Sequence, residues 1–237
     1  MSLIPKDYHW SWNNFLTDEI VMELDGIEKK IGTNINPERD KVLRFMKCNL
    51  YDIKVVILGQ DPYPEKGKAT GRAFEVGDLV SWNQKFRQVS LKNIVRLLYK
   101  NYNGITEYKD IKKFSEIQKE IKEGKFSILP PNEIFGSWES QGVLLLNTYL
   151  SVEAGISGSH IPIWENFSRE LLKFISQENK NISWFLWGKM AEDKKRFIRY
   201  GKYYESRHPM MCSEFYEDDF LKNDCFKDTM SIINWKD

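Results

Sequence analysis

The sequence predicts an α/β protein in three layers, α/β/α, with a central, mostly parallel, four-stranded sheet between helices. Three short runs are continuously apolar, which is typical of strands buried on both faces. Segments with apolar residues at helical spacing separate these runs, and such alternation is typical of a parallel sheet. No shift of composition divides the 237 residues, so we expect a single domain over residues 1–237.

Four strands are predicted, the first three from apolar runs and the fourth partly from its position in the chain. They are Ile53–Leu58, Val143–Leu146, Ile182–Trp187 and Lys202–Glu205. In open α/β sheets, ligands bind beyond the carboxyl ends of the strands. We therefore expect the active site at that edge of the sheet.

Helices are predicted between the strands. Pro37 is expected in the first turn of one helix, where proline is well tolerated, and Ser90 is expected to cap another. Two more helices are predicted over residues 164–175 and from Met190 to Ile198. The apolar positions that indicate the first three helices are Val42, Phe45, Met46, Leu91, Ile94, Val95, Leu98, Trp164, Phe167, Leu171, Leu172 and Ile175.

Residues 107–125 form a strongly charged segment. Ile111, Phe114, Ile117 and Ile121 recur in it at helical spacing. A charged segment with one apolar stripe is typical of a solvated helix that lies on the protein surface. We therefore predict a surface helix here.

Charge and composition limit the classes of function. Lys and Arg number 35 and Asp and Glu 34, so the net charge of +1 excludes a strongly basic whole-protein footprint for nucleic acid, though not a local one. No apolar run approaches the roughly 18–20 residues that span a bilayer, and the first residues lack a secretory pattern. We expect a cytoplasmic protein that does not associate with membranes.

The cysteines and histidines show no metal-binding spacing. Cys48, Cys212 and Cys225 are widely separated, and the three histidines form no HxH or HxxxH pattern. An odd number of scattered cysteines is typical of reduced thiols. We therefore expect neither a metal nor another cofactor.

Polar side chains follow the predicted strands. Asp61 and Tyr63 follow the first strand, Asn147 follows the second, and His208 follows the fourth. Each alone has an ordinary explanation, since Asp and Asn often cap turns and a lone His is usually structural. Their joint placement at one sheet edge instead predicts a site with a carboxylate, an amide and an imidazole. It lacks a serine or cysteine nucleophile with a matched base.

Longer motifs at these positions resemble family 1 uracil-DNA glycosylases. GQDPY at residues 59–63, with Gly71 and Phe74, resembles the water-activating motif, and GVLLLNTYLSVEAG from Gly142 resembles the uracil-reading strand. FLWG at 185–188 and the His208-Pro209 pair resemble the third strand and the start of the DNA-intercalation loop. The resemblance implies a monofunctional, DNA repair-type glycosylase that flips uracil out of DNA, hydrolyses its N-glycosidic bond and leaves an abasic site.

The resemblance implies a role for each matching residue of the pocket. Asp61 would orient or activate the water and offset positive charge on the sugar, while His208 would donate to O2 of the departing uracil. Both roles suit a reaction that separates charge, because preorganised groups stabilise such a transition state.

Base recognition would fall to four further residues. Tyr63 would exclude the methyl group of thymine, and Phe74 would stack on the flipped base. Asn147 would select uracil over cytosine, and Gln60 would supply backbone contacts at the pocket floor.

The DNA-binding segments depart from the family pattern. Ser90 matches a phosphate-gripping serine, but a Ser-Pro-Leu-Ser run is replaced by Met210, Met211, Cys212 and Ser213. Counting places Cys212 where the family has a wedge leucine. Met210 or Met211 would serve as the wedge or simply pack against the core, and both interpretations stay open. Ser213 matches a second serine of the family.

Acidic residues follow this loop at positions 217–219, where the family has a basic segment. Acids near phosphate weaken DNA binding. We therefore expect uracil-containing DNA as the partner, with single-stranded DNA as a preferred substrate. Residues 104–128 are expected to be a charged helical insertion relative to the family.

Two alternatives remain beside uracil excision. The first is a glycosylase for another modified base in phage or host DNA, against which Tyr63 and Asn147 argue because both suit a small, uracil-shaped pocket. The second is a non-excising DNA-binding accessory protein, which would need neither Asp61 nor His208. We also expect a monomer, and a proteinaceous inhibitor that mimics uracil or DNA as a further partner.

Overall fold

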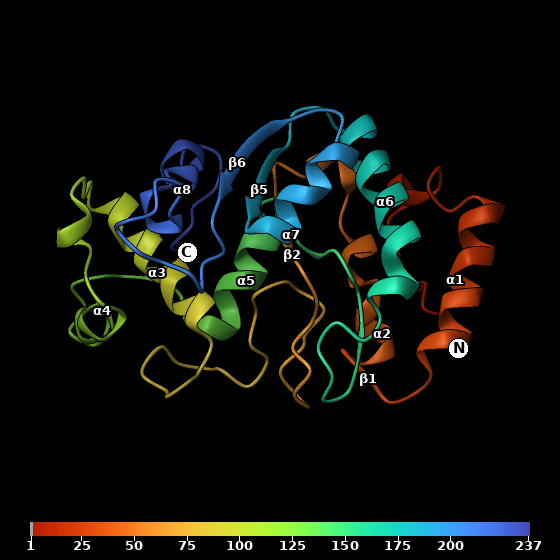
Figure 1. The fold of residues 1–237 in the computed structure, drawn as a ribbon, viewed down its shortest axis with the longest axis horizontal. Helices are drawn as coiled ribbons and strands as arrows, with labels where there is room; N and C mark the ends of the chain where they lie inside the picture. The colour runs from red at the N-terminus through yellow and green to blue at the C-terminus, as the bar shows by residue number, and fades with distance from the viewer. Residues whose placement is uncertain (1) are drawn as a thin grey trace.

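A four-stranded parallel sheet runs through the middle of the computed structural model, which describes residues 2–237 (Figure 1). The strand order is β3-β2-β5-β6, and every neighbouring pair is parallel. The strands are β2 (Val55–Gly59), β3 (Val143–Asn147), β5 (Ser183–Trp187) and β6 (Lys202–Ser206). All four predicted strands are confirmed, with small shifts at their ends.

Helices cover both faces of the sheet, so the predicted α/β/α architecture is confirmed (Figure 1). One face packs against α1 (Asp18–Ile31) and α6 (Ile161–Glu178). The other packs against α3 (Val89–Tyr102), α5 (Pro131–Ser140) and α8 (Cys225–Thr229). Within residues 2–237, no helix combines the length and apolar character that crossing a membrane requires.

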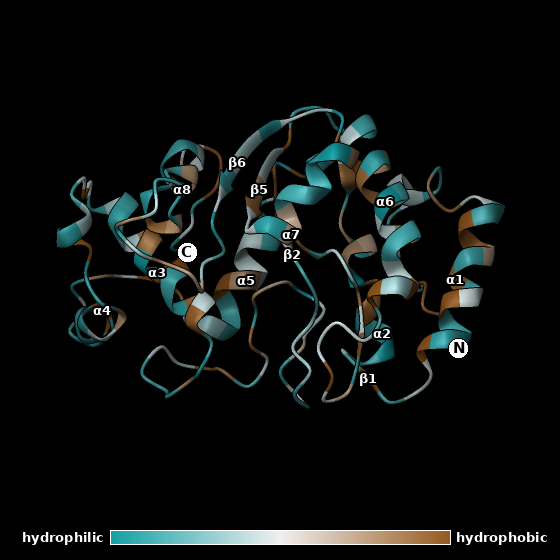
Figure 2. Cartoon of the chain, in the orientation of Figure 1, coloured by the Kyte–Doolittle hydropathy of each residue, from teal (hydrophilic) through white to brown (hydrophobic). Residues whose placement is uncertain are grey.

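Strands β2, β3 and β5 are mostly apolar because both of their faces are buried, whereas the edge strand β6 is largely polar and partly exposed. Val56 and Leu58 of β2 belong to the core on the α1 and α6 side, whereas Val55 and Ile57 belong to the core on the α3 side. Figure 2 shows hydrophobic residues interleaved with hydrophilic ones along α1 and α3, as expected for helices with one buried face. This packing fixes the sheet whose edge carries the site.

Two short strands lie beside the main sheet and were not predicted. β1 (Ile35–Asn36) pairs antiparallel with β4 (Val152–Glu153). Strands of two residues carry no recognisable sequence pattern, and α1 and α5 were also absent from the prediction. The pairing joins the segment after β3 to the N-terminal part of the chain.

The helix predicted around Pro37 begins later than expected. β1 ends at Asn36, so Pro37 leaves a strand, and the short helix α2 (Arg39–Val42) starts two residues further on. Phe45 and Met46 are buried as expected, but they lie in a 3₁₀ turn.

Two other helix predictions also need correction. Ser90 is not a cap: α3 begins at Val89 after Gln88, and the Ser90 side chain is left free to line a cavity. The stretch from Met190 to Ile198 is not one helix but α7 (Lys189–Glu192) followed by a 3₁₀ turn. In that turn, buried Lys194 makes an ion pair with Glu165 of α6 at 2.7 Å.

The charged segment contains the predicted surface helix, α4 (Phe114–Lys122). Phe114 and Ile117 are buried, and α4 packs against α3 on the outside of the molecule (Figure 1). The helix is shorter than the apolar pattern suggested. Ile111, the first residue of that pattern, is buried but lies before the helix begins.

Candidate active site at the carboxyl ends of the strands

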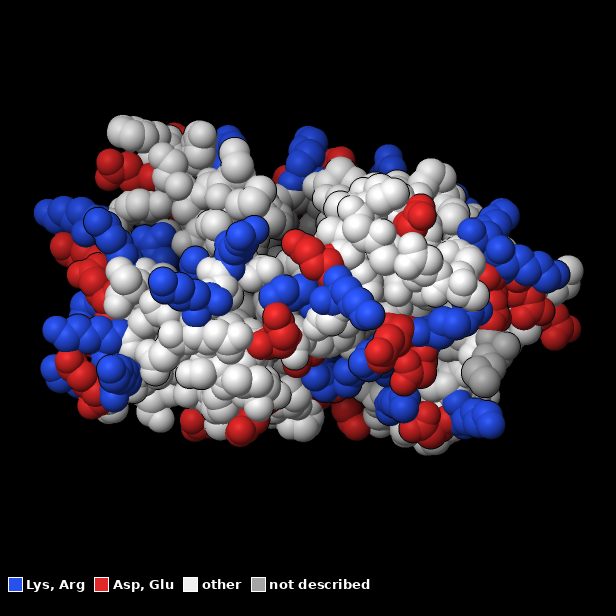
Figure 3. Space-filling model, turned by 90° about the horizontal axis from the view of Figure 1, so that it is seen from below, with Lys and Arg blue, Asp and Glu red and all other residues white. Residues whose placement is uncertain are grey.

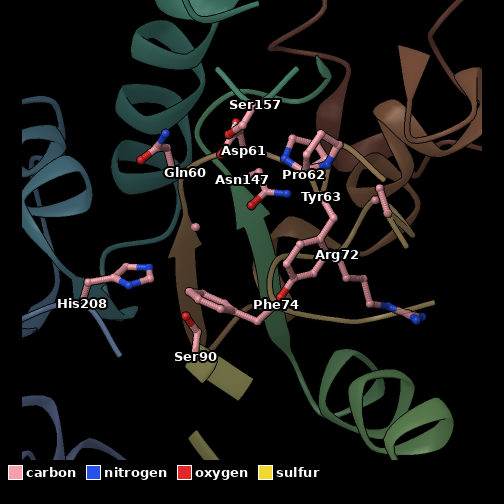
Figure 4. Close-up of a pocket in the computed structure, with 14 residues that line it drawn as sticks. Gln60, Asp61, Pro62, Tyr63, Arg72, Phe74, Ser90, Asn147, Ser157 and His208 are labelled. Atoms are coloured by element: carbon pink, nitrogen blue, oxygen red, sulfur yellow. Dashed lines mark hydrogen bonds between the residues drawn. The ribbon is translucent and has the colours of Figure 1, made fainter. Parts of the chain in front are cut away.

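A cavity of about 290 Å³ lies at the carboxyl ends of β2 and β3. Figure 4 shows side chains converging on it from the segments after β2 and β3, from the start of α3 and from the segment after β6. The cavity brings together seven of the residues predicted from the sequence. They are Gln60, Asp61, Tyr63, Phe74, Ser90, Asn147 and His208. The cavity therefore lies at the sheet edge where the active site was predicted.

Asp61 is held by two donors from the segment after β4. Its Oδ2 accepts a hydrogen bond from Ser157 Oγ at 2.8 Å and from the Gly158 backbone N–H at 2.6 Å. Ser157 also lines the cavity. Ser157 was not predicted from the sequence, because its contact with Asp61 joins residues 96 positions apart.

The two segments that meet at Asp61 are also joined through Pro64. The Pro64 carbonyl accepts hydrogen bonds from the Asn36 amide at 2.6 Å and from the Gly155 backbone N–H at 2.9 Å. Together with the β1–β4 pairing, these contacts fix the 61–64 turn against the 152–158 segment. The Asp61 carboxylate therefore lies in a preset position.

Asn147 is placed by the register of β2 and β3, in which it is the partner of Gly59. A Cβ atom on Gly59 would lie 2.4 Å from Asn147 Oδ1, so this position requires glycine. The Asn147 side chain is buried on the cavity wall and makes no hydrogen bond with any residue in the described range 2–237. Its amide is thus available to a ligand.

Aromatic side chains form two walls of the cavity. Phe74 has φ of +65°, the one positive value among non-glycine residues of the described chain, and its ring lies 5.6 Å from that of Trp187. Such a conformation costs on the order of 1–3 kcal/mol and indicates that the surroundings impose it. Burial raises the pKa of Tyr63, so its hydroxyl stays neutral.

His208 enters the cavity from the end of β6 and is neutral. Its Nδ1 accepts a hydrogen bond from the Met210 backbone N–H at 3.2 Å, so the neutral ring carries its proton on Nε2. Burial lowers the pKa of His208, which favours the neutral form. The ring fits because residue 188 is glycine: a Cβ atom there would lie 2.8 Å from His208 Cβ.

A second cavity of about 240 Å³ adjoins the first and shares His208 and Phe74 with it. Met210 and Met211 line this second cavity, and their side chains are 58% and 52% exposed. Packing against the core therefore does not explain these two methionines. From the sequence alone, packing against the core and a role as a wedge were both open for Met210 and Met211.

Cys212 and Ser213 lie differently from the two methionines. Cys212 is half-buried against the core on the α3 side, and its Sγ donates to the Pro209 carbonyl at 3.3 Å. Burial raises the pKa of this thiol to about 12. Cys212 thus points inward, although counting placed it at the wedge position. The half-buried Ser213 donates its backbone N–H to Asp219 at 2.5 Å.

The three acids at 217–219 differ in burial, since Glu217 and Asp218 are exposed and Asp219 is not. Asp219 is buried and accepts hydrogen bonds from the backbone N–H groups of Ser213 and Leu221. Asp218 makes an ion pair with Arg207 at 2.8 Å. Two of the three carboxylates therefore stabilise the loop.

The remaining histidine and cysteine positions show no second reactive cluster. His160 is buried and its Nδ1 lies 2.9 Å from Ser151 Oγ, a structural contact. Cys48, Cys212 and Cys225 are free thiols. In the part of the chain that the structure describes, no three His, Cys, Asp or Glu side chains gather into a group that could hold a metal ion.

Comparison with protein families finds a match over residues 45–231 to the uracil DNA glycosylase superfamily. A uracil-DNA glycosylase of Borrelia duttonii is 36% identical over 238 residues, which cover 94% of this chain and 92% of that protein. A uracil-DNA glycosylase of Francisella philomiragia is 32% identical over 244 residues, covering 95% and 99%.

Comparison with solved structures finds the same fold. The chain matches the UNG crystal structure from Nitratifractor salsuginis with a TM-score of 0.70 and 22% identity, covering 94% of this chain and 90% of that one. It matches the mimivirus uracil-DNA glycosylase with a TM-score of 0.60 and 24% identity, covering 84% and 68%. A mimivirus UNG variant with a TM-score of 0.60 was solved in complex with UGI.

Proposed function

This chain belongs to the uracil DNA glycosylase superfamily and is a monofunctional uracil-DNA glycosylase, and we propose how its residues release uracil from DNA. The observation that carries the assignment of roles is the convergence of Asp61, Asn147 and His208 on one cavity. Each role depends on where the side chain lies in that cavity, and not on residue type alone.

Asp61 is proposed to orient the attacking water and to stabilise positive charge on the sugar. The N-glycosidic bond breaks with its electron pair going to the base, and positive charge develops on the sugar. The Asp61 carboxylate stabilises that charge and orients a water molecule, whose oxygen bonds to the sugar carbon. The proton of this water passes to the carboxylate and then to solvent.

His208 is proposed to stabilise the departing base. Because its Nδ1 accepts the Met210 backbone N–H, its Nε2–H is the donor left for O2 of the uracil anion. A preorganised donor of this kind is typically worth roughly 3–4 kcal/mol in the transition state.

The walls of the cavity are proposed to select uracil. Asn147 presents an unpaired amide to the O4/N3 edge, and Phe74 offers a fixed ring on which the flipped base stacks. Tyr63 blocks the place of a methyl group at C5, and Gln60 contributes backbone contacts at the floor. A pocket of this construction does not favour a larger modified base. It also argues against a DNA-binding protein that lacks catalysis.

DNA binding is proposed along the start of α3. Residues 79–106 contain five basic and no acidic residues, within a chain of net charge +1. Lys85, Arg87 and Lys92 make no ion pair with any residue from 2 to 237 and are free to contact phosphate. Ser90 lines the cavity beside them and is proposed to grip a phosphate.

The loop after β6 is proposed to enter the DNA helix. Met210 and Met211 are its exposed apolar side chains, and apolar wedges of this kind unstack base pairs. Ser213, at the end of this stretch, is proposed as a second phosphate contact. Cys212 points inward and is proposed to support the loop.

Figure 3 shows that the face formed by the loops after the strands carries charges of both signs. A mixed surface of this kind holds duplex DNA less firmly than a uniformly basic one, so single-stranded DNA is proposed as the better substrate. We also propose a cytoplasmic monomer. A protein inhibitor that covers this face is proposed as a further partner, by analogy with the mimivirus complex.

The test is release of free uracil from a single-stranded oligonucleotide with one uracil, in buffer with a metal chelator. We expect full activity of the natural protein and a loss of about 10³-fold in kcat for Asp61→Asn, which keeps the shape but not the charge. Undiminished release by Asp61→Asn would remove Asp61 from the mechanism. Absence of release by the natural protein would contradict the whole proposal.

A further inference from the structure

One hydroxyl group in the cavity has no part in the proposed roles of the other residues. Ser157 Oγ lies on the cavity wall and donates to Asp61 Oδ2 at 2.8 Å (Figure 4). Ser157 itself is exposed, so this hydrogen bond does not serve to satisfy a buried group in the core. The hydrogen bond instead fixes the position of the Asp61 carboxylate.

Both donors to Asp61 bind the same oxygen. Ser157 Oγ and the Gly158 N–H both bond Oδ2, whereas Oδ1 has no hydrogen bond with any residue that the structure describes. Two donors on one oxygen oppose rotation of the carboxylate and leave the other oxygen to face the cavity. Hydrogen bonds to a charged acceptor are stronger than neutral ones, so these two donors hold the carboxylate firmly.

The backbone around Ser157 is held independently of Asp61. Ser159 Oγ accepts the Glu153 backbone N–H at 2.7 Å and donates to the Ile156 carbonyl at 2.9 Å, which closes the loop on itself. Gly155 is bonded to the Pro64 carbonyl. The Ser157 hydroxyl is therefore aimed at Asp61 by a loop that keeps its shape without that contact.

We propose that Ser157 is a positioning residue for hydrolysis: it holds Asp61 Oδ2 so that Oδ1 faces the attacking water. The inference rests on the proposed role of Asp61. Ser157 acts through the carboxylate and not on the base, so it affects the rate of the chemical step and not the binding of uracil.

The experiment compares Ser157→Ala, Ser157→Thr and Ser159→Ala on single-stranded uracil DNA. We expect Ser157→Ala to lower kcat about tenfold with KM unchanged, because one hydrogen bond to a charged group is lost while the Gly158 bond remains. Ser157→Thr keeps a hydroxyl and restores most of the rate. Ser159→Ala loosens the same loop without touching Asp61, and its effect on kcat stays within about threefold.

A double-variant cycle tests whether Ser157 works through Asp61. In single-turnover assays, Ser157→Ala in the Asp61→Asn background should give no further loss of rate. The inference is overturned if Ser157→Ala matches the natural protein, if Ser159→Ala causes an equal loss, or if the two losses multiply. If the natural protein itself releases no uracil, the proposed function is overturned instead. The two failures are distinguishable, because this one is seen without any variant.

Discussion

The floor of the catalytic cavity and the loop that follows β6 face the same substrate in our proposal, but they are built differently. Gly59 and Asn147 lie in register on neighbouring strands, with no room for one methyl group between them. Met210 and Met211 stand more than half exposed on a loop. Reaction chemistry requires fixed distances, whereas a wedge requires only apolar volume, so the floor tolerates far less change than the loop.

His208 gives the first way to sharpen this comparison, because it begins the loop yet points into the cavity. We expect His208→Ala to lower kcat by about 10²–10³-fold on single- and double-stranded DNA alike, through loss of one transition-state donor. The measurement is steady-state uracil release on both substrates. His9→Ala, remote from the cavity, is the control. A loss confined to duplex DNA would group His208 with the wedge rather than with the floor.

Gly59→Ala tests the floor directly. The added methyl group would lie 2.4 Å from Asn147 Oδ1 and 3.0 Å from Ala73 Cβ, so it displaces the amide that we propose reads uracil. We expect a loss of about 10²-fold in kcat/KM, as a misplacement of about 1 Å can cause. Gly26→Ala, a glycine of α1 with no atom within 4 Å of the added methyl, is the matched control and should keep full activity.

Removal of the apolar wedge should have a smaller and more selective effect. We expect the double change Met210→Ala with Met211→Ala to lower kcat/KM about tenfold on duplex DNA and less than about threefold on single strands, since only the duplex must be unstacked. Met22→Ala, a change at a methionine on α1 that is 72% exposed, controls for surface substitution. Equal losses on the two substrates would contradict the wedge.

The smallest expected effect concerns stability and pH. Burial lowers the pKa of both His160 and His208 below 6.5, so the unfolded chain takes up protons that the folded chain does not as the pH falls through that value. The free energy of unfolding should therefore decrease as the pH falls from 7.5 to 5.5. Urea unfolding at the two pH values measures it, and His160→Asn should reduce the difference. An unchanged difference would contradict the contribution of His160.

Much of the fold and of the site was predictable from local pattern. Continuous apolar runs predicted β2, β3 and β5, because burial on both faces leaves few polar positions in them, whereas β6 was predicted partly from its position in the chain. Asp61, Asn147 and His208 were predicted at one edge because parallel strands end on the same side. The helix around Ser90 was predicted, but Ser90 is not its cap because α3 begins at Val89. Pro37 was misplaced because β1, which pairs with β4, ends just before it, and the stretch from Met190 forms only part of a short helix and a 3₁₀ turn.

The amino-acid sequence by itself determined the strand order along the chain, seven of the residues that line the cavity and the family to which the chain belongs. Only the tertiary structure decided that Ser157 holds Asp61, that Cys212 and Asp219 turn inward, and that Met210 and Met211 turn outward. The physical reason is the distance along the chain over which each feature is determined. Periodicity and strand ends are set by neighbouring residues, whereas the direction of a loop side chain is set by partners that packing brings from distant parts of the chain.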